Sequence, residues 1–107
     1  MSLLGGRVIK IERRGRFSDG QGGFIDSWAE VATERGRVRS SSGRERELGH
    51  KFGAEISHVG YIRQGANVKP QDRLVAGSIY LKVHAVRDWG FEGGHLELDC
   101  EEQQSGG

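Results

Sequence analysis

Apolar and charged side chains alternate along several short segments of this chain. In Val8–Arg13, Ile9 and Ile11 alternate with Lys10 and Glu12. Successive side chains of an extended backbone point to opposite faces, so a period of two residues predicts a strand with one buried and one solvated face. Such strands have to come together, because each needs a partner surface to cover its apolar face.

Glycine-rich breaks separate the segments that fit strands. The chain has 18 glycines and one proline in 107 residues, a composition that suits tight turns and disfavours long helices. Turns are expected at Ser18–Gly23 and at Gly77–Ser78, where glycine adopts positive φ angles at little cost. The expected strands are Val8–Arg13, Phe24–Val31, Ile56–Arg63, Arg73–Ala76, Ile79–Val86 and His95–Glu101.

These features predict a mainly β protein, a small antiparallel barrel of about six strands, closed or partly open, with one long loop or short helix. The length allows one domain over residues 1–107, with about residues 7–101 ordered and 102–107 as a tail. A domain of this size buries only about two-thirds of its unfolded surface, so neighbouring subunits are one expected source of stability. The expected core residues are Ile9, Ile11, Trp28, Ile62, Ile79, Leu81, Val83, Leu96 and Leu98.

Residues 43–54 fit a short helix and a mobile loop equally well. The segment is rich in Arg and Glu and poor in apolar residues, which predicts weak attachment to the core. The residues assigned to this mobile segment are Gly43, Glu45, Gly49 and Gly53. Two interpretations remain open: a loop that becomes ordered on assembly, and an ordinary flexible surface loop.

Residues able to carry chemistry are scattered. The histidines His50, His58, His84 and His95 share no zinc-ligand spacing with one another or with Cys100, so neither a metal site nor another cofactor is expected. Cys100 stands in an acidic run that disfavours the thiolate, which favours a buried apolar role over nucleophilic catalysis. We therefore expect a protein that is not an enzyme, and a small hydrolase has little support from the residues.

The chain also shows no sign of a membrane or secretory protein. It has no apolar run long enough for a membrane span or a signal peptide, and its single cysteine cannot form an internal disulfide. We expect a protein without a membrane partner that is made inside the cell.

An arginine row is the most distinctive charged feature. Arg35, Arg37 and Arg39 alternate with Gly36 and Val38, so in an extended segment their guanidinium groups share one face. Arg44 and Arg46 continue the row. The row is either a solvated strand face or a surface that contacts another molecule. The formal net charge of +1 argues against a dedicated nucleic-acid binder.

Charge is also polarised along the chain, with a basic beginning and an acidic end. The candidate interface residues are Arg13, Arg14, Glu97, Asp99 and Glu101. They pair either within one subunit or across a head-to-tail interface between copies, where complementary charge sets the register. Pairing within the subunit is slightly favoured, because the first and last strands of small barrels often adjoin.

The order and spacing of several segments resemble a known family. They are Val8–Arg13, Asp19–Gly23, Ser27–Ala32, Gly36–Val38, Ser42–Glu45, Ile56–Arg63, Arg73–Val75 with Ile79–Tyr80, and Leu96–Glu101. No one of these pieces is specific, but together they resemble the head-tail joining proteins of long-tailed phages, also called head-closure or stopper proteins. The resemblance covers most of the chain.

This resemblance implies a structural virion protein with a small β-barrel, a long loop and a short helix. It implies a homo-oligomeric ring of twelve copies, as in that family, under the portal and its adaptor protein. The ring would close the DNA exit channel after packaging, contact the packaged DNA non-specifically and dock a tail terminator or tail-completion protein. In such a ring the arginine row would be a channel or inter-subunit surface that repeats with every subunit and attracts DNA phosphate. Its place would be the virion neck, after assembly in the bacterial host cytoplasm. A tail-completion protein, which can share this barrel, is an alternative.

The main rival is a free-standing nucleic-acid-binding barrel of the oligonucleotide-binding kind. Its stacking platforms would be Phe17, Phe24, Tyr61 or Trp89 beside arginine side chains. Its weakness is the low net charge.

Overall fold

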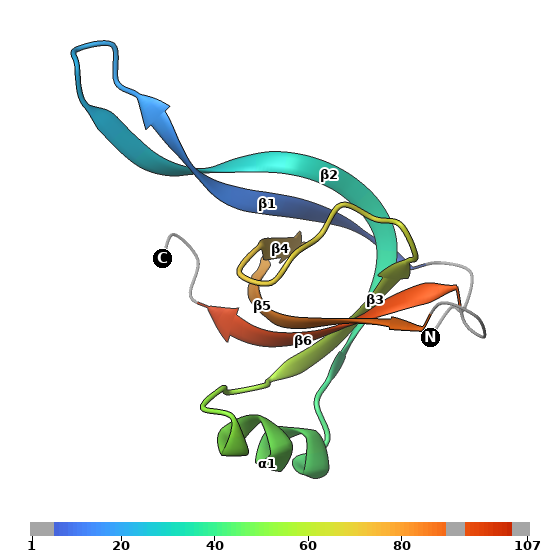
Figure 1. Ribbon diagram of the computed structural model, residues 1–107. Coiled ribbons are helices and arrows are strands. Elements are labelled where there is room, and N and C mark those ends of the chain that lie inside the picture. The colour runs from blue at the N-terminus through green and yellow to red at the C-terminus, as the bar shows by residue number, and fades with distance from the viewer. Residues whose placement is uncertain (1–5, 90–93, 104–107) are drawn as a thin grey trace.

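The computed structural model describes residues 6–89 and 94–103, except for the side chains of Phe17 and Trp89. The elements are β1 (Arg7–Ser18), β2 (Phe24–Ser40), α1 (Gly43–Lys51), β3 (His58–Arg63), β4 (Arg73–Ala76), β5 (Ile79–Trp89) and β6 (His95–Gln103). The strands form a closed barrel in the order β1-β2-β3-β6-β5-β4, and neighbouring strands run antiparallel (Figure 1). The predicted mainly β fold is therefore confirmed, with the barrel closed.

The inside of the barrel is filled by alternate residues of the strands. In β6, Leu96, Leu98 and Cys100 are buried while their neighbours along the strand are less so, as a period of two requires. Ile79 is partly buried and packs against the same cluster. The buried cluster consists of Ile9, Ile11, Ile62, Val68, Leu74, Ala76, Leu81, Val83, Leu96, Leu98 and Cys100.

Trp28, an expected core residue, lies outside this cluster. The register of β1 and β2 shifts between Ile11 and Glu12, and beyond this bulge the two strands leave the barrel, so no core is available to cover the ring. The guanidinium of Arg73 instead lies 4.4 Å from the centroid of the Trp28 ring, and that of Arg14 lies 5.9 Å from it. Trp28 is thus held by cations at the base of a hairpin.

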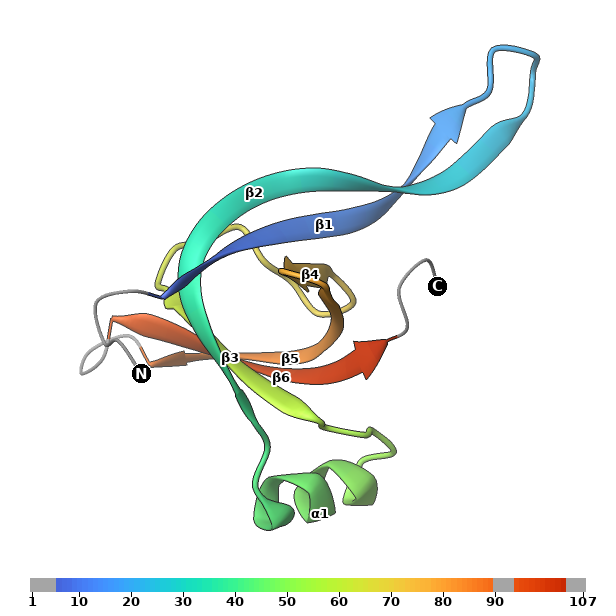
Figure 2. The same cartoon turned by 180° about the vertical axis from the view of Figure 1, so that it is seen from behind.

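β1 and β2 are both longer than expected and form a projecting hairpin. β1 pairs with β4 only over Ile9–Glu12, and β2 pairs with β3 only over Gly36–Ser40. Residues 14–28, which we call the arm, therefore pair only with each other and extend away from the barrel (Figures 1 and 2). At the tip, the Asp19 carboxylate accepts hydrogen bonds from the backbone N–H groups of Gln21 and Gly23.

The segment after β2 contains a capped helix. Ser42 and Glu45 form a capping box: the Ser42 hydroxyl accepts from the Glu45 N–H at 3.2 Å, and the Glu45 carboxylate accepts from the Ser42 N–H at 2.7 Å. α1 buries none of its residues. Both a short helix and a mobile loop were expected for residues 43–54. The structure shows a helix over residues 43–51.

The end of the last strand differs from expectation. β6 runs to Gln103, so Glu102 and Gln103 belong to the barrel rather than to the expected tail. The rest of that tail, residues 104–107, lies outside the described residues. On β3, Ile62 is buried in the main cluster, and Val59, which points to the opposite face, is also buried, so both faces of β3 are covered.

Candidate interaction surfaces

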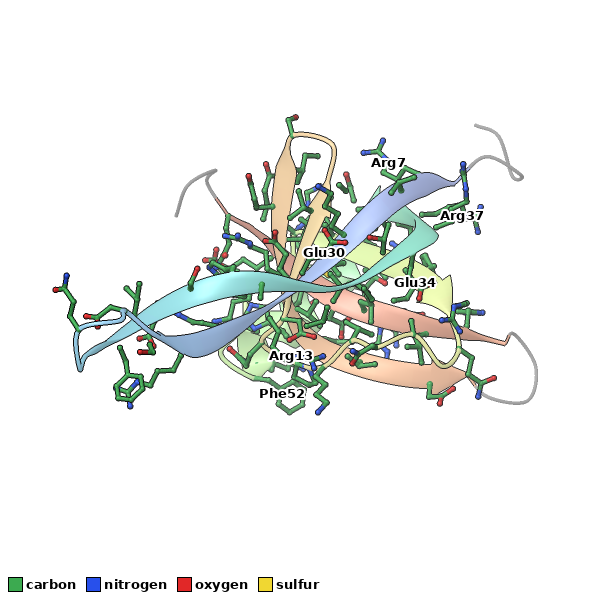
Figure 3. The ribbon with its side chains drawn as sticks, turned by 90° about the horizontal axis from the view of Figure 1, so that it is seen from above. Arg7, Arg13, Glu30, Glu34, Arg37 and Phe52 are labelled. Carbon is green, nitrogen blue, oxygen red and sulfur yellow. The ribbon has the colours of Figure 1, made fainter. Side chains whose placement is uncertain are left out.

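The arginine row does lie along one extended strand. Arg35, Arg37 and Arg39 are exposed on β2. Arg35 and Arg37 line a hollow of about 550 Å³, which we call the basic hollow, together with Gly6, Gly36, Tyr61, Ile62, Arg63 and His95. Arg37 lies at the end of the barrel away from the arm, and Arg7 lies near it (Figure 3).

The cations of the basic hollow differ in their partners. Arg63 donates to both carboxylate oxygens of Glu34 at 2.8 and 2.9 Å. Arg35 donates to the backbone oxygen of Gly6 at 3.5 Å. Among the described residues, Arg37 has no hydrogen-bond or ion-pair partner, so its charge is the one most available to an anion.

Arg39 has a structural role instead. Its guanidinium donates to both carboxylate oxygens of Glu45 at 2.9 and 2.7 Å and to the Tyr61 hydroxyl at 3.1 Å. These hydrogen bonds, together with those from Ser42, hold the pKa of Glu45 at about 2. Arg39 therefore joins β2 to the first turn of α1 and does not point freely from the arginine row.

The last two arginines of the row belong to α1. Arg46 donates to the backbone oxygen of Ser41 at 2.8 Å, and the buried Ser41 hydroxyl donates to the backbone oxygen of Ile56 at 2.6 Å. Arg44 is exposed, with no partner among the residues that the structure describes. The five arginines are thus divided between a strand at the barrel end and the start of a helix.

The candidate interface charges mostly pair within the subunit. Arg13 donates two hydrogen bonds of 2.9 Å to the buried Asp72, and the carboxylate of Glu101 lies 2.8 Å from Nε2 of His84. The expectation that the first and last strands adjoin is wrong, because β1 neighbours β2 and β4 while β6 neighbours β3 and β5. The basic beginning and the acidic end therefore find other partners.

Two of these partners were not identified from the sequence. Asp72 follows the turn after Pro70, where Gln71 has a φ of 79°, and it also accepts from the Lys69 N–H at 2.8 Å. Arg87 binds both Glu97 and Asp99. The alternation along β6 could have indicated an outward acidic row, but not which strand supplies its cation.

A groove lies between α1 and the outer faces of β5 and β6. It has a volume of about 470 Å³, and we call it the α1 groove. Phe52, which is 86% exposed, and Leu48, which is 47% exposed, stand at this site. The full lining is Glu45, Leu48, Gly49, Phe52, Gly53, Ala54, Ile56, His84, Ala85, Arg87 and Asp99.

Gly49 allows α1 to approach the segment that follows it. A Cβ atom at Gly49 would lie 2.7 Å from the Ile56 side chain and 2.9 Å from the backbone oxygen of Ala54. Of the glycines assigned to the mobile segment, Gly49 is therefore required by packing, whereas Gly53 has a φ of 75° in the turn after the helix.

The chemistry-bearing residues remain apart in the fold. Burial raises the pKa of the Cys100 thiol to about 12, with a smaller contribution from Asp99. Within residues 6–89 and 94–103, no three His, Cys, Asp or Glu side chains are grouped as a metal site would require. The helix in this part of the chain is also too short and too polar to cross a membrane.

The two stacking platforms whose side chains the structure describes, Phe24 and Tyr61, do not share one surface. Phe24 lies at the tip of the arm, where Arg16 stands 5.4 Å from its ring centroid. Tyr61 lines the basic hollow at the barrel end away from the arm. The side chains of Phe17 and Trp89 are outside the described part.

The structure is a small closed barrel with a projecting arm and with charged and apolar side chains on its outer surface. The family model "Phage head completion protein" matches residues 6–103. The chain belongs to this family and has a structural role in the head–tail region of a phage particle.

Solved structures similar to the chain include the following two. Protein SF1141 from Shigella flexneri 2a aligns with a TM-score of 0.74 and 17% identity, over 97% of this chain and 99% of that chain. A chain of the virion of a native gene transfer agent particle aligns with a TM-score of 0.59 and 25% identity, over 92% of this chain and 94% of that chain. None of the curated proteins compared with the chain matches it.

Proposed function

We propose that the protein forms a ring in the neck of a phage particle, closes the DNA exit channel after packaging and offers a docking surface to the tail. The observation that carries this proposal is the match to phage head completion proteins over residues 6–103. The similarity to a chain of a gene transfer agent virion supports a place in the particle. The proposed ring has twelve copies, with a portal or adaptor protein on one side and a tail terminator or tail-completion protein on the other.

The basic hollow supports a contact with packaged DNA. A ring repeats Arg35 and Arg37 in every subunit, so a protein of net charge +1 still presents a basic collar at one barrel end. Contacts of this kind bind phosphate without reading sequence, and they weaken as salt rises.

Electron microscopy of particles made without the protein tests the proposed function. We expect heads that fill, lose their DNA and carry no tails, and we expect the wild-type protein supplied in trans to restore tailed, filled particles. Tailed particles that retain DNA in the absence of the protein would contradict the proposal.

The same particles separate the proposed role from that of a tail-completion protein. If the protein closes the channel, its absence releases packaged DNA. If it instead completes the tail, heads keep their DNA and unattached tails accumulate. The DNA content of purified heads, measured after nuclease treatment, distinguishes the two roles.

A further inference from the structure

Most of the large apolar side chains that the barrel leaves exposed occur in two places. The exposed ones among the described residues are Val8, Phe24, Ile25, Leu48 and Phe52. Phe24 and Ile25 are 65% and 56% exposed at the tip of the arm, and Leu48 and Phe52 belong to the α1 groove. Of these five side chains, only Val8 lies outside the two sites. Exposed apolar side chains that cluster in this way indicate surfaces that another macromolecule covers.

The α1 groove has the size and lining to receive an aromatic side chain. Its volume of about 470 Å³ falls in the range of pockets that enclose apolar groups. Leu48, Phe52 and Ile56 supply apolar walls, and Glu45 and Asp99 supply carboxylates. The groove therefore suits a segment that combines an aromatic ring with a cation.

The arm presents that combination on one of its faces. Arg14 pairs with Trp28 and Arg16 with Asp26 in the register of β1 and β2, and cross-strand partners share a face. The guanidinium groups of Arg14 and Arg16 lie over the rings of Trp28 and Phe24, and neither makes an ion pair within the described part of the chain. With Asp26 included, this face carries one net positive charge.

The charges beside the α1 groove complement the arm. Among the side chains that line the groove, Glu45 and Asp99 carry carboxylates and Arg87 carries a guanidinium, so carboxylates are in excess. The pKa of Asp99 is raised, first by burial and also by Glu97 and Glu45, against the opposing effect of Arg87. An additional cation near Asp99 would relieve this repulsion.

The arm cannot fill the groove of its own subunit. It leaves the barrel on one side while α1 lies on another, as Figures 1 and 2 both show. In Figure 3, Phe52 lies at the margin of the barrel and the arm extends away to the side. The occupant must therefore come from another molecule, and a second copy always carries a suitable arm.

We propose that the tip of the arm of one copy docks in the α1 groove of the next copy, with Phe24 against Leu48 and Phe52. The two surfaces differ, so the contact is head-to-tail and repeats from copy to copy, and it closes into a ring when the rotation between copies allows it. This inference deepens the proposed ring by naming the surfaces that build it.

Cysteine cross-linking of the full chain tests this contact. Phe24→Cys and Phe52→Cys are introduced together, and mild oxidation is applied both to purified protein at high concentration and to assembled particles. We expect a ladder of covalent oligomers. The native Cys100 is buried in the core, so the unmodified chain is the blank. An equal mixture of the two single variants should stop at the covalent dimer, since each copy then has one reactive site.

A matched pair of cysteines provides the control. Val8 is 51% exposed on β1, away from both surfaces, so Phe24→Cys with Val8→Cys should give no ladder. The absence of a ladder from the Phe24–Phe52 pair in both settings overturns the inference. Incorporation of the wild-type protein into particles is scored separately: if the protein is absent from particles, the proposed function fails, whereas its presence without cross-links refutes only this interface.

A charged substitution gives a second readout. Phe24→Asp should leave the unfolding temperature of the isolated subunit nearly unchanged, because the ring is mostly exposed, and should reduce incorporation into particles at least tenfold. Val8→Asp should incorporate like wild type. Equal incorporation of the Phe24→Asp and wild-type proteins would rule out the contact.

Discussion

Glu45 connects α1 to strand β2, and its contacts lower the pKa of its own carboxyl group. Its carboxylate caps the N-terminus of α1 and accepts two hydrogen bonds from Arg39. Because α1 buries none of its residues, these contacts of Glu45 help to hold the helix against the barrel.

The attachment of α1 should therefore depend on pH. The Glu45 pKa falls from an ordinary value of 4.5 to about 2 in the fold, so the stabilisation is complete above pH 4.5 and is lost as pH falls through about 2. We expect the Ser42 and Glu45 amide signals in NMR spectra to move toward disordered positions over this window.

Two variants sharpen this prediction. Glu45→Gln should remove the pH dependence and weaken the helix by about 1 kcal/mol at pH 7, the usual contribution of a cap. Glu47→Gln, at an exposed position of the same helix, should behave like wild type. A pH profile of Glu45→Gln that matches wild type would show that another group controls the helix.

At the scale of elements, the arm and the barrel are separable. The arm pairs only with itself, whereas β1 and β2 each meet a third strand nearer the barrel. A side-chain contact does join the arm to the barrel: the guanidinium of Arg73 lies over the Trp28 ring.

Replacing residues 14–28 with Asn-Gly should therefore leave a folded barrel. The replacement joins Arg13 to Ala29, which are paired in the register, through a turn that two-residue hairpins favour. We expect a loss of about 1 kcal/mol from the missing cation–π contact, measured by thermal unfolding, together with loss of assembly into particles. An insoluble or unfolded product would show that the barrel depends on the arm.

The sequence predicts individual strands better than it predicts their order in the barrel. The alternation of Leu96, Leu98 and Cys100 predicted β6 and its inward face, because local periodicity reports burial directly. It could not reveal that β6 lies between β3 and β5, since strand order depends on contacts far apart in the chain. Ser42 and Glu45, three residues apart, match the sequence pattern of a capping box, and this pattern would have favoured the helix over the loop for residues 43–54.

The candidate sites were harder to predict for a physical reason. The arginine row was visible as a pattern, but Arg39 looked equivalent to Arg37 because its partner Glu45 lies across a turn between a strand and a helix. Trp28 was expected inside because large rings usually anchor cores, but it lies in the part of β2 that leaves the barrel and pairs only with β1.

For the whole molecule, the proposed contact with DNA can be tested at one position. Arg37→Glu reverses the cation of the basic hollow that has no partner in the described part of the chain, so the subunit should fold normally. Particles carrying it should lose packaged DNA faster than wild type, and the difference should shrink at high salt. Arg39 is unsuitable for this test because reversing it would also break its contacts with α1.

Lys10→Glu is the matched control. Lys10 is exposed on β1 and changes the charge of the subunit by the same amount. Nuclease sensitivity of the packaged DNA measures the effect, and equal sensitivity of the Arg37→Glu and Lys10→Glu particles would argue against a specific role of the basic hollow.

The length of the ladder between β1 and β2 has a mechanical consequence. Twelve residue pairs, from Arg7–Gly36 to Ser18–Phe24, join the two strands, and the hydrogen bonds of an antiparallel ladder run across the strand direction. A tension that pulls one strand lengthwise against the other loads these bonds together, whereas a sideways force at the tip peels them one pair after another. The subunit should consequently yield far more readily to peeling than to shear.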